Sequence, residues 1–341
     1  ADYLPFDTGG DAAALLDALR PGALVFAKLD LWPVLAERAS RARVPLGMIS
    51  ATLAEGSSRR GGLAAGALRD AYARLDLVGA IAEDDAERLV ALGVRRDAVR
   101  VTGDTRYDQV WRRAEAADRA GPLLAPLGAP GRFTLVAGST WPADERVLLE
   151  AWALVRRQDA RARLVVAPHE PTEAHLAPIE AWARGQRASL ARLSAVERGE
   201  ATGDVDVVLV DRVGVLGELY AIGDAAYVGG GFHDAGLHSV LEPAAYGIPV
   251  AFGPRHANSR DAGLLLAAGG ASAERTARTL AELVKRWLTS ETLRRHAGQA
   301  ARGVVRTGLG ADERAWGVVR ELLTENARTS GGARREAVDS T

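Results

Sequence analysis

Short runs of β-branched and other apolar residues alternate with amphipathic stretches along most of this chain, and this alternation constrains the fold most. It is typical of parallel sheets whose strands are connected by helices. The runs expected to form strands are 23–27, 45–50, 77–82, 99–103, 133–139, 163–168, 206–210, 225–230 and 248–253. The stretches between them, such as 31–43 and 58–74, have the spacing of amphipathic helices. The sequence therefore predicts an α/β fold.

One break in the alternation predicts two domains. Residues 119–131 contain three prolines and three glycines, which interrupt a helix or a central strand. We therefore expect a Rossmann-like N-terminal domain at 1–120, a linker at 121–131, a Rossmann-like C-terminal domain at 132–326 and a disordered polar tail at 327–341. Two such domains imply a cleft, with ligands bound beyond the carboxyl ends of the strands.

The composition excludes several classes of function. The chain has 341 residues, 48% of them apolar and 26% charged, with a formal net charge of -1. This balance favours neither nucleic acid nor an anionic membrane as a partner. Cysteine is absent, which excludes disulfides and thiolate metal sites. No signal peptide and no membrane-spanning run is evident, and because the first residue is Ala1 we expect a processed product or a piece of a longer protein.

The stretch 228–250 has three consecutive glycines, two histidines and a Glu-Pro pair between two apolar runs. A loop without side chains allows backbone amides to approach a ligand, and a helix beginning near Ser239 would face that ligand. His238 would then lie beside a phosphate, and Glu242 would accept hydrogen bonds from ribose hydroxyls. The alternative is structural, because Ser239 and Glu242 have the S-x-x-E spacing of a capping box. The residues alone leave both interpretations open.

Two further turns of the second domain have a structural and a functional interpretation. Ser139 and Thr140 enter a helix after the run 133–139, where they either cap that helix or face an anion. Gly217 and Glu218 stand at the start of a short helix, whose simplest interpretation is a buried amphipathic helix with a glutamate that complements its dipole.

His169 follows the run 163–168, at the edge where the strand-end loops should converge. With Glu170, Glu173 and His175 it offers several types of metal ligand, but their spacing matches no known metal site, and we expect no metal. The sequence also contains no G-x-S-x-G, P-loop, G-x-G-x-x-G or H-E-x-x-H motif.

The first domain offers a second set of candidates. Lys28 and Asp30 follow the strand run 23–27, and Trp32 stands at a helix start. Mixed charges at a strand end suit an anionic or hydroxylated substrate, although an exposed turn has the same composition. Arg59 lies in a polar loop, where it is either solvated or positioned to bind phosphate.

Taken together, these loops resemble those of the 3-deoxy-D-manno-octulosonic acid (Kdo) transferases, which are glycosyltransferases of the GT-B fold. The resemblance lies in seven stretches that occur in the family's order. They are residues 3–7 (YLPFD), 28–33 (KLDLWP), 50–57 (SATLAEGS), 101–108 (VTGDTRYD), 137–140 (AGST), 217–231 and 236–254. In the last stretch Gly236, His238, Leu241, Glu242, Pro243, Gly247 and Pro249 match the family's pattern.

The resemblance implies an inverting transfer of Kdo from CMP-Kdo to a lipid A precursor in lipopolysaccharide biosynthesis, without a cofactor. It places the protein at the cytoplasmic face of an inner membrane, as a peripheral protein. It assigns to the donor pocket Ser139, Thr140, His169, Gly217, Glu218, Gly230, Gly231, Gly236, His238, Ser239 and Glu242. Lys28, Trp32 and Arg59 would lie on the acceptor side.

The chain also departs from the family's pattern. The family's catalytic Glu belongs to an S-x-G-E motif that lies upstream of the first matching stretch, so the resemblance implies a first domain incomplete at its N-terminus. Asp30 is then the candidate substitute base. Lys28 stands where the family has a Glu, Pro168 where it has an Arg and Ser239 where it has an Asn. Two alternatives stay open, namely a GT-B enzyme with a UDP- or GDP-sugar donor and a non-catalytic binding protein.

Overall fold

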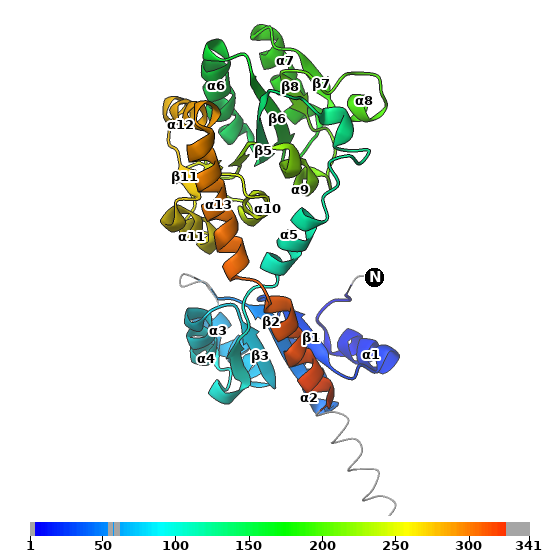
Figure 1. The fold of residues 1–341 in the computed structure, drawn as a ribbon. Coiled ribbons are helices and arrows are strands. Elements are labelled where there is room, and N and C mark those ends of the chain that lie inside the picture. The colour runs from blue at the N-terminus through cyan, green and yellow to red at the C-terminus, as the bar shows by residue number, and fades with distance from the viewer. Residues whose placement is uncertain (1–3, 54–56, 58–61, 325–341) are drawn as a thin grey trace, which may run out of the picture. The chain divides into compact units, whose positions relative to one another are not determined.

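The computed structural model describes residues 4–53, 57 and 62–324. The chain divides into two compact units (Figure 1). The first unit comprises the residues up to Asp108 together with those from Gly308 onward, and the second comprises Gln109–Thr307. Each unit contains one parallel sheet with helices packed on it. The predicted α/β class is therefore confirmed.

The first unit has a four-stranded sheet in the order β1-β2-β3-β4. Its strands are β1 (Leu24–Ala27), β2 (Leu46–Ala51), β3 (Leu77–Ala80) and β4 (Val99–Val101). Its helices are α1 (Gly9–Leu19), α2 (Pro33–Arg41), α3 (Gly62–Ala73), α4 (Glu83–Leu92), the 3-10 helix η2 (Arg96–Ala98) and a helix over 311–324. Phe26, Leu35, Met48, Val78 and Leu89 belong to its buried core, which combines strand and helix side chains.

The second unit has a seven-stranded sheet in the order β11-β10-β9-β5-β6-β8-β7. The strands are β5 (Phe133–Thr140), β6 (Ala162–Pro168), β7 (Leu190–Arg192), β8 (Val207–Leu209), β9 (Ala225–Val228), β10 (Val250–Phe252) and β11 (Ala271–Ala273). The helices are α5 (Arg106–Glu115), which begins before the unit boundary, α6 (Pro142–Gln158), α7 (Glu173–Gly185), α8 (Leu193–Glu197), α9 (Leu216–Leu219), α10 (Leu241–Ala245), α11 (Arg260–Ala268), α12 (Ala277–Thr289) and α13 (Glu291–Thr307). Two 3-10 helices are η3 (Ala125–Leu127) and η4 (Tyr220–Ile222).

Both faces of this second sheet are covered, as the near-continuous apolar strands require. Successive residues of β5 point to opposite faces, so Leu135 packs in the cluster formed with α6, α7 and α12, while Val136 packs with η3, α8 and α9. In Figure 1 α6 and α12 lie along one side of the sheet. Along the chain the strands are added first on the β6 side of β5 and then on its β9 side. The topological switch point is therefore between β5 and β9.

The linker predicted at 121–131 belongs to the second unit. Leu124 and Leu127 are buried in its core, and the guanidinium of Arg163 donates to the backbone oxygens of Leu127 (2.8 Å) and Gly203 (2.7 Å). The prolines and glycines end regular structure here, but the leucines between them still bury apolar surface. The chain instead crosses between units at 108/109 and at 307/308.

The predicted C-terminal domain likewise extends too far. Residues 311–324 form a helix of the first unit, where Val318 and Leu322 pack with Leu77. Arg100 and Glu321 form a bidentate ion pair at 2.6 and 2.7 Å in the same unit. An amphipathic pattern predicts such a helix but does not identify the sheet it covers. The predicted tail at 327–341 lies outside the described residues.

Asp206 anchors an edge of the second sheet, and its contribution to stability is testable. Burial opposes its ionisation, but donors from Arg132 (2.8 Å), Arg156 (2.5 Å) and Ser189 (3.0 Å) outweigh burial and lower its pKa to about 2. We expect Asp206→Asn to reduce the free energy of unfolding by about 2 kcal/mol at pH 7. A depressed pKa stabilises the fold above the unfolded value near 4, so the deficit should shrink as the pH falls toward 2.

Urea denaturation at pH 7 and at pH 3 would measure this effect. Asp159→Asn is the matched control, because Asp159 pairs with Arg161 (2.6 Å) at the surface, where an ion pair contributes about 0.5 kcal/mol or less. Equal losses for both variants at pH 7 would contradict the assignment.

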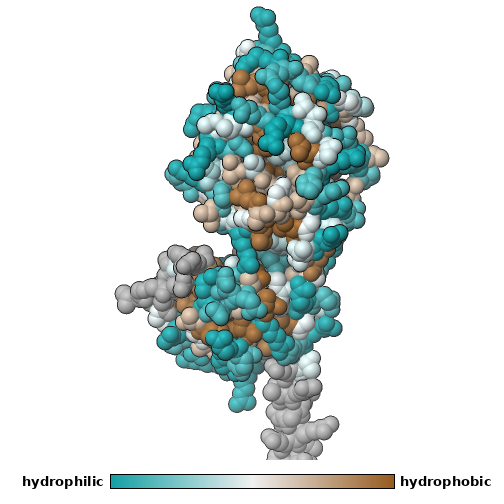
Figure 2. Space-filling view, turned by 60° about the vertical axis from the view of Figure 1, so that its left-hand side comes forward, coloured by the Kyte–Doolittle hydropathy of each residue, from teal (hydrophilic) through white to brown (hydrophobic). Residues whose placement is uncertain are grey.

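Among the described residues, no helix is both long enough and apolar enough to cross a bilayer. Figure 2 shows apolar patches interspersed with hydrophilic surface on the face in view.

Candidate functional site

The carboxyl ends of β5 and β9 meet at the switch point of the second unit, and three loops gather there. Trp141 follows β5, His169 follows β6, and the glycine-rich loop 229–240 follows β9. Parallel pairing of β5 with both β6 and β9 brings these ends to one edge. In an open parallel sheet this edge is where ligands bind.

One indole and three imidazoles form an aromatic cluster at this edge. The ring of Trp141 stacks on His233 with centroids 4.4 Å apart and planes 8° apart. The ring centroid of Trp141 also lies 4.6 Å from that of His169 and 6.3 Å from that of His238. The rings of His169 and His238 stack with their centroids 4.4 Å apart. The structure therefore brings together the predicted pair His169 and His238. Sequence reasoning missed Trp141 and His233.

The hydrogen bonding of His238 defines its tautomer. The indole Nε1–H of Trp141 lies 3.0 Å from Nε2 of His238. An indole nitrogen only donates, so Nε2 accepts and the proton of the neutral ring is on Nδ1. Burial lowers the pKa of His238, and the neighbouring His169 and His233 lower it further against the opposing effect of Asp144. The residue is thus a neutral imidazole whose Nδ1–H is its donor.

Replacing Trp141 should change this titration. In Trp141→Phe the neutral form of His238 loses an accepted hydrogen bond, so protonation no longer costs that bond. We expect the pKa of His238 to rise toward its ordinary value. Histidine ring signals in an NMR titration would measure it, with the exposed Trp316→Phe as control. An unchanged pKa would rule out the assigned hydrogen bond.

Asp144 organises the glycine-rich loop. Its fully buried carboxyl group accepts from the backbone N–H groups of Trp141 (3.0 Å), Gly230 (2.8 Å) and Phe232 (3.1 Å) and from the hydroxyl of Tyr227 (3.2 Å). Burial raises the pKa of Tyr227 well above its usual range, and the negative charge of Asp144 raises it further. One side chain of α6 therefore ties the end of β5 to the loop after β9.

The glycines themselves allow backbone segments to approach one another. A Cβ on Gly229 would lie 2.2 Å from the Ser139 oxygen, and one on Gly231 would lie 2.4 Å from the Gly253 nitrogen. Gly230 (φ 94°) and Gly236 (φ 84°) adopt left-handed conformations that favour glycine. The amides of Gly230, Gly236 and His238 already donate within the protein. The assignment of the predicted Gly230, Gly231 and Gly236 to a ligand therefore stays a prediction.

The helix expected to begin at Ser239 begins later. α10 starts at Leu241 after Val240, and no side-chain hydrogen bond caps it. The capping box considered as the structural alternative for Ser239 and Glu242 is therefore wrong. Ser239 is exposed, and its N–H and that of Val240 donate to no atom of the described residues. Val240 is fully buried, so the amide of Ser239, rather than a long helix, remains available beside His238.

The capping role considered for Ser139 and Thr140 is also wrong. The N-cap of α6 is Trp141, whose N–H donates to Asp144. Ser139 has a left-handed φ of 54°, and the buried hydroxyl of Thr140 donates to Glu145 at 2.9 Å. A contact of Ser139 or Thr140 with an anion stays a prediction.

Glu242 belongs to a second cluster at the same edge, with Gly217 beside it. Nη1 of Arg113 donates to Oε1 of Glu242 at 3.0 Å, and a Cβ on Gly217 would lie 2.8 Å from that nitrogen. Burial raises the pKa of Glu242, and Arg113 opposes the shift. The predicted Gly217 and Glu242 are therefore neighbours, with the predicted Glu218 adjacent in the chain. Sequence reasoning missed Arg113, which lies more than a hundred residues away.

Comparison with known proteins identifies the family. A family model described as 3-deoxy-D-manno-octulosonic-acid transferase matches residues 1–109. The 3-deoxy-D-manno-octulosonic acid transferase of Haemophilus influenzae is 24% identical over 95% of this chain and 75% of that protein. The enzyme of the same name from Bordetella pertussis is 31% identical over 325 residues, covering 94% of this chain and 74% of that protein. The chain belongs to the Kdo transferase family.

Solved structures show the fold of this Kdo transferase family member. A putative UDP-N-acetylglucosamine 2-epimerase from Listeria monocytogenes has a TM-score of 0.62 at 15% identity, covering 92% of this chain and 79% of that chain. A second UDP-N-acetylglucosamine 2-epimerase also has a TM-score of 0.62, covering 94% of this chain and 77% of that chain. The expected GT-B fold with Rossmann-like units is confirmed.

In the first unit of this Kdo transferase family member, Lys28, Asp30 and Trp32 follow β1 as predicted. Lys28 and Asp30 are exposed, and Trp32 is the half-buried N-cap residue of α2. Asp7, from the YLPFD stretch, accepts from the N–H groups of Val34 (3.1 Å) and Leu35 (2.8 Å) at the start of that helix. The carboxylate of Asp30 accepts from no described residue, and its role as a base stays a prediction. Arg59 lies outside the described residues.

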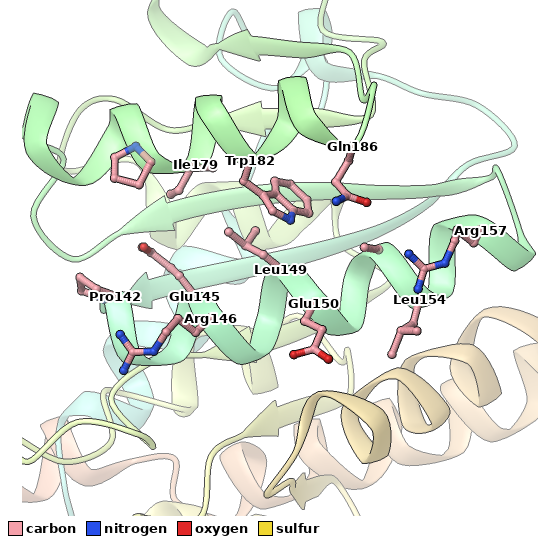
Figure 3. Close-up of a pocket in the computed structure, with 12 residues that line it drawn as sticks. Pro142, Glu145, Arg146, Leu149, Glu150, Leu154, Arg157, Ile179, Trp182 and Gln186 are labelled. Carbon is pink, nitrogen blue, oxygen red and sulfur yellow. The ribbon is translucent and has the colours of Figure 1, made fainter.

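A groove of about 470 Å³ separates α6 from α7 in the second unit (Figure 3). Leu149, Ile179 and Trp182 point into it, and Glu145 lies near its Pro142 end. Burial raises the pKa of Glu145, although the hydrogen bond from Thr140 opposes the shift. Glu145 thus lines this apolar groove and also accepts a hydrogen bond from Thr140, the last residue of β5.

Within the described part of the chain, no three His, Asp or Glu side chains are grouped so that they would hold a metal ion. The metal interpretation considered for His169, Glu170, Glu173 and His175 therefore gains no support. His175 instead uses its Nδ1 in a 2.7 Å contact with the backbone oxygen of Glu170.

Proposed function

We propose that this chain transfers Kdo from CMP-Kdo to a hydroxyl of a lipid A precursor, with inversion at the anomeric carbon. The observation that carries the proposal is 31% identity to a Kdo transferase over 94% of the chain. Convergence of predicted donor residues at the switch point of the second unit supports it. The same family resemblance supports peripheral association with the cytoplasmic face of an inner membrane.

In this proposal the aromatic cluster and the start of α10 receive the phosphate of the donor. Nδ1–H of His238 and the N–H group of the exposed Ser239 are donors that the described protein leaves unused. They supply hydrogen bonds where negative charge develops on departing CMP. A neutral imidazole suits this role, because it donates without requiring a proton from solvent.

Glu242 holds the ribose in the same proposal. Oε1 accepts from Arg113, and Oε2 makes no hydrogen bond with a described residue, so it remains to accept from a ribose hydroxyl. The phosphate would then lie between Trp141 and α10, with His169 and the glycine-rich loop on its other sides. The donor would be oriented by two clusters anchored to one strand end.

The reaction forms a bond between the acceptor oxygen and the anomeric carbon while the bond from that carbon to the phosphate oxygen breaks. The acceptor proton passes to a general base, and CMP leaves with the bonding electron pair. Asp30, whose carboxylate is exposed after β1, is the proposed base. Lys28, Trp32 and Arg59 are the proposed acceptor-side residues.

Release of CMP from CMP-Kdo, measured with and without a lipid A precursor, tests the proposal. We expect His238→Ala to lower kcat/KM about a hundredfold, as loss of a donor to developing charge does in other enzymes. His296→Ala, at an exposed position of α13, is the control. A wild-type chain that neither binds CMP nor releases it would overturn the proposal. A thermal-shift comparison of CMP with UDP and GDP would reveal another nucleotide donor.

A further inference from the structure

Arg113 presents unused hydrogen-bond donors beside Glu242. Its Nη1 makes one contact, at 3.0 Å, and 45% of its side chain is exposed. Its other guanidinium N–H groups donate to no described residue. Because the guanidinium lies where a side chain on Gly217 would be, the glycine allows Arg113 to reach this position. The result is a cation with several free donors next to the proposed ribose carboxylate.

The helix that carries Arg113 is fixed to the second unit. The guanidinium of Arg302 on α13 lies 4.6 Å from the ring centroid of Trp111 and forms an ion pair with Glu115. These contacts hold the α5 residues on both sides of Arg113. A side chain on a fixed helix loses less freedom when it binds a ligand, which favours recognition.

A hydroxyl without a partner lies in the same cluster. Tyr246 follows α10, and its oxygen is buried without a hydrogen bond to any described residue. Burial raises its pKa to about 12, and the nearby carboxylate of Glu218 contributes next. The hydroxyl is therefore protonated near neutral pH. Buried polar atoms usually have partners, and within the described residues Tyr246 adds an unpaired hydroxyl beside Glu218 and Arg113.

Glu218 completes the cluster with an acceptor. It stands next to Gly217 on α9, its side chain is exposed, and its carboxylate accepts from no described residue. Arg113 only donates and Glu218, when ionised, only accepts. Arg113 would therefore bind a ligand edge that carries an acceptor, and Glu218 would bind an edge that carries a donor.

We propose that Arg113 and Glu218 read the base of the donor nucleotide and select cytosine over uracil. Arg113 donates to the ring carbonyl next to the ribose, and Glu218 accepts from the exocyclic amine. Uracil carries a carbonyl oxygen in place of that amine, and this oxygen would face the carboxylate. Carboxylates recognise the cytosine amine in the same way in nucleic-acid complexes. The inference rests on the proposed function, because it needs a nucleotide with its ribose at Glu242.

Calorimetric titration of the full chain with CMP and with UMP tests the selection. For the wild type we expect CMP to bind about tenfold more tightly or better, as one well-placed base contact provides. In Glu218→Gln the ratio should fall toward unity, because an amide both accepts and donates. Arg113→Gln should weaken both nucleotides. Arg112→Gln, which removes the same charge from the adjacent position of α5, should leave both affinities and their ratio unchanged.

The outcomes separate this inference from the proposed function. If the wild type binds neither nucleotide, the donor-site proposal fails and the base selection fails with it. If the wild type binds CMP and UMP equally, or if Glu218→Gln keeps the full CMP preference, the inference alone is overturned. A purely structural role for Glu218 would change melting temperature but not the CMP-to-UMP ratio, so the ratio is the deciding measurement.

Discussion

Asp144→Ala is expected to lower the free energy of unfolding by about 4 kcal/mol and to abolish measurable CMP binding. Three backbone N–H groups and one hydroxyl converge on this carboxyl group, which has no exposed surface. Its removal leaves the buried N–H of Gly230 and the buried hydroxyl of Tyr227 without an acceptor, and each such donor costs about 1–3 kcal/mol. The loop of residues 229–240 would also lose its anchor on α6, and with it the position of His238.

Two further variants make this expectation specific. Asp144→Asn keeps the shape but replaces one accepting oxygen with a donor, so we expect a loss of about half that of alanine. Glu150→Ala lies on the same helix at an exposed position and should change stability by less than about 0.5 kcal/mol. Chemical denaturation and calorimetric CMP titration measure the two effects. An Asp144→Ala protein with wild-type stability and affinity would contradict the role assigned to Asp144.

Much of the sheet structure was predictable because buried parallel strands are short apolar runs bounded by polar turns. The run 133–139 differs from β5 by one residue, and the run 225–230 contains β9. β7 (LAR) and β11 (ASA) were missed, since neither contains a β-branched residue, whereas the equally short edge strand β4 (VRV) contains two. The order of the strands in each sheet could not be predicted either, because pairing depends on contacts between segments that are distant in the sequence.

The unit boundary was mispredicted because composition is a weak guide to packing. Proline and glycine identify the end of regular structure, but Leu124 and Leu127 decide that 121–131 belongs to a core. The return of residues 311–324 to the first unit depends on Val318 and Leu322 meeting Leu77. No local signal identifies that partner, because the contacts join residues more than two hundred positions apart.

For the candidate site, the sequence indicated the correct strand ends but not the contacts between them. His169 and His238 were predicted and are stacked. Trp141 was missed because its partner His238 is 97 positions away. Asp144 carried a signal that was available, since an acidic residue three positions after a helix N-cap commonly binds the N-cap amide. The S-x-x-E pattern at Ser239 was misleading because α10 has only five residues and starts two positions later.

Gly229→Ala should be among the most destabilising single-methyl substitutions in this chain, with a loss of about 3 kcal/mol. The added Cβ would lie 2.2 Å from the Ser139 oxygen and 2.6 Å from the Thr140 Cα, and both are backbone atoms. Relief requires the ends of β5 and β9 to separate, which would also break the bond from the Gly229 N–H to the Gly138 oxygen (2.9 Å). Because His238 donates its own N–H to the Gly229 oxygen (3.1 Å), the distortion should reach the proposed phosphate site.

Gly263→Ala provides the matched control for that substitution. Gly263 lies within α11, and a Cβ there would meet no atom within 4 Å. Alanine has the higher helix propensity, so this variant should gain about 0.5–1 kcal/mol. The two variants add the same methyl group and should shift the denaturation midpoint in opposite directions. A midpoint for Gly229→Ala equal to that of the wild type would show that the strand ends separate easily, and a donor site built on their fixed spacing would then be untenable.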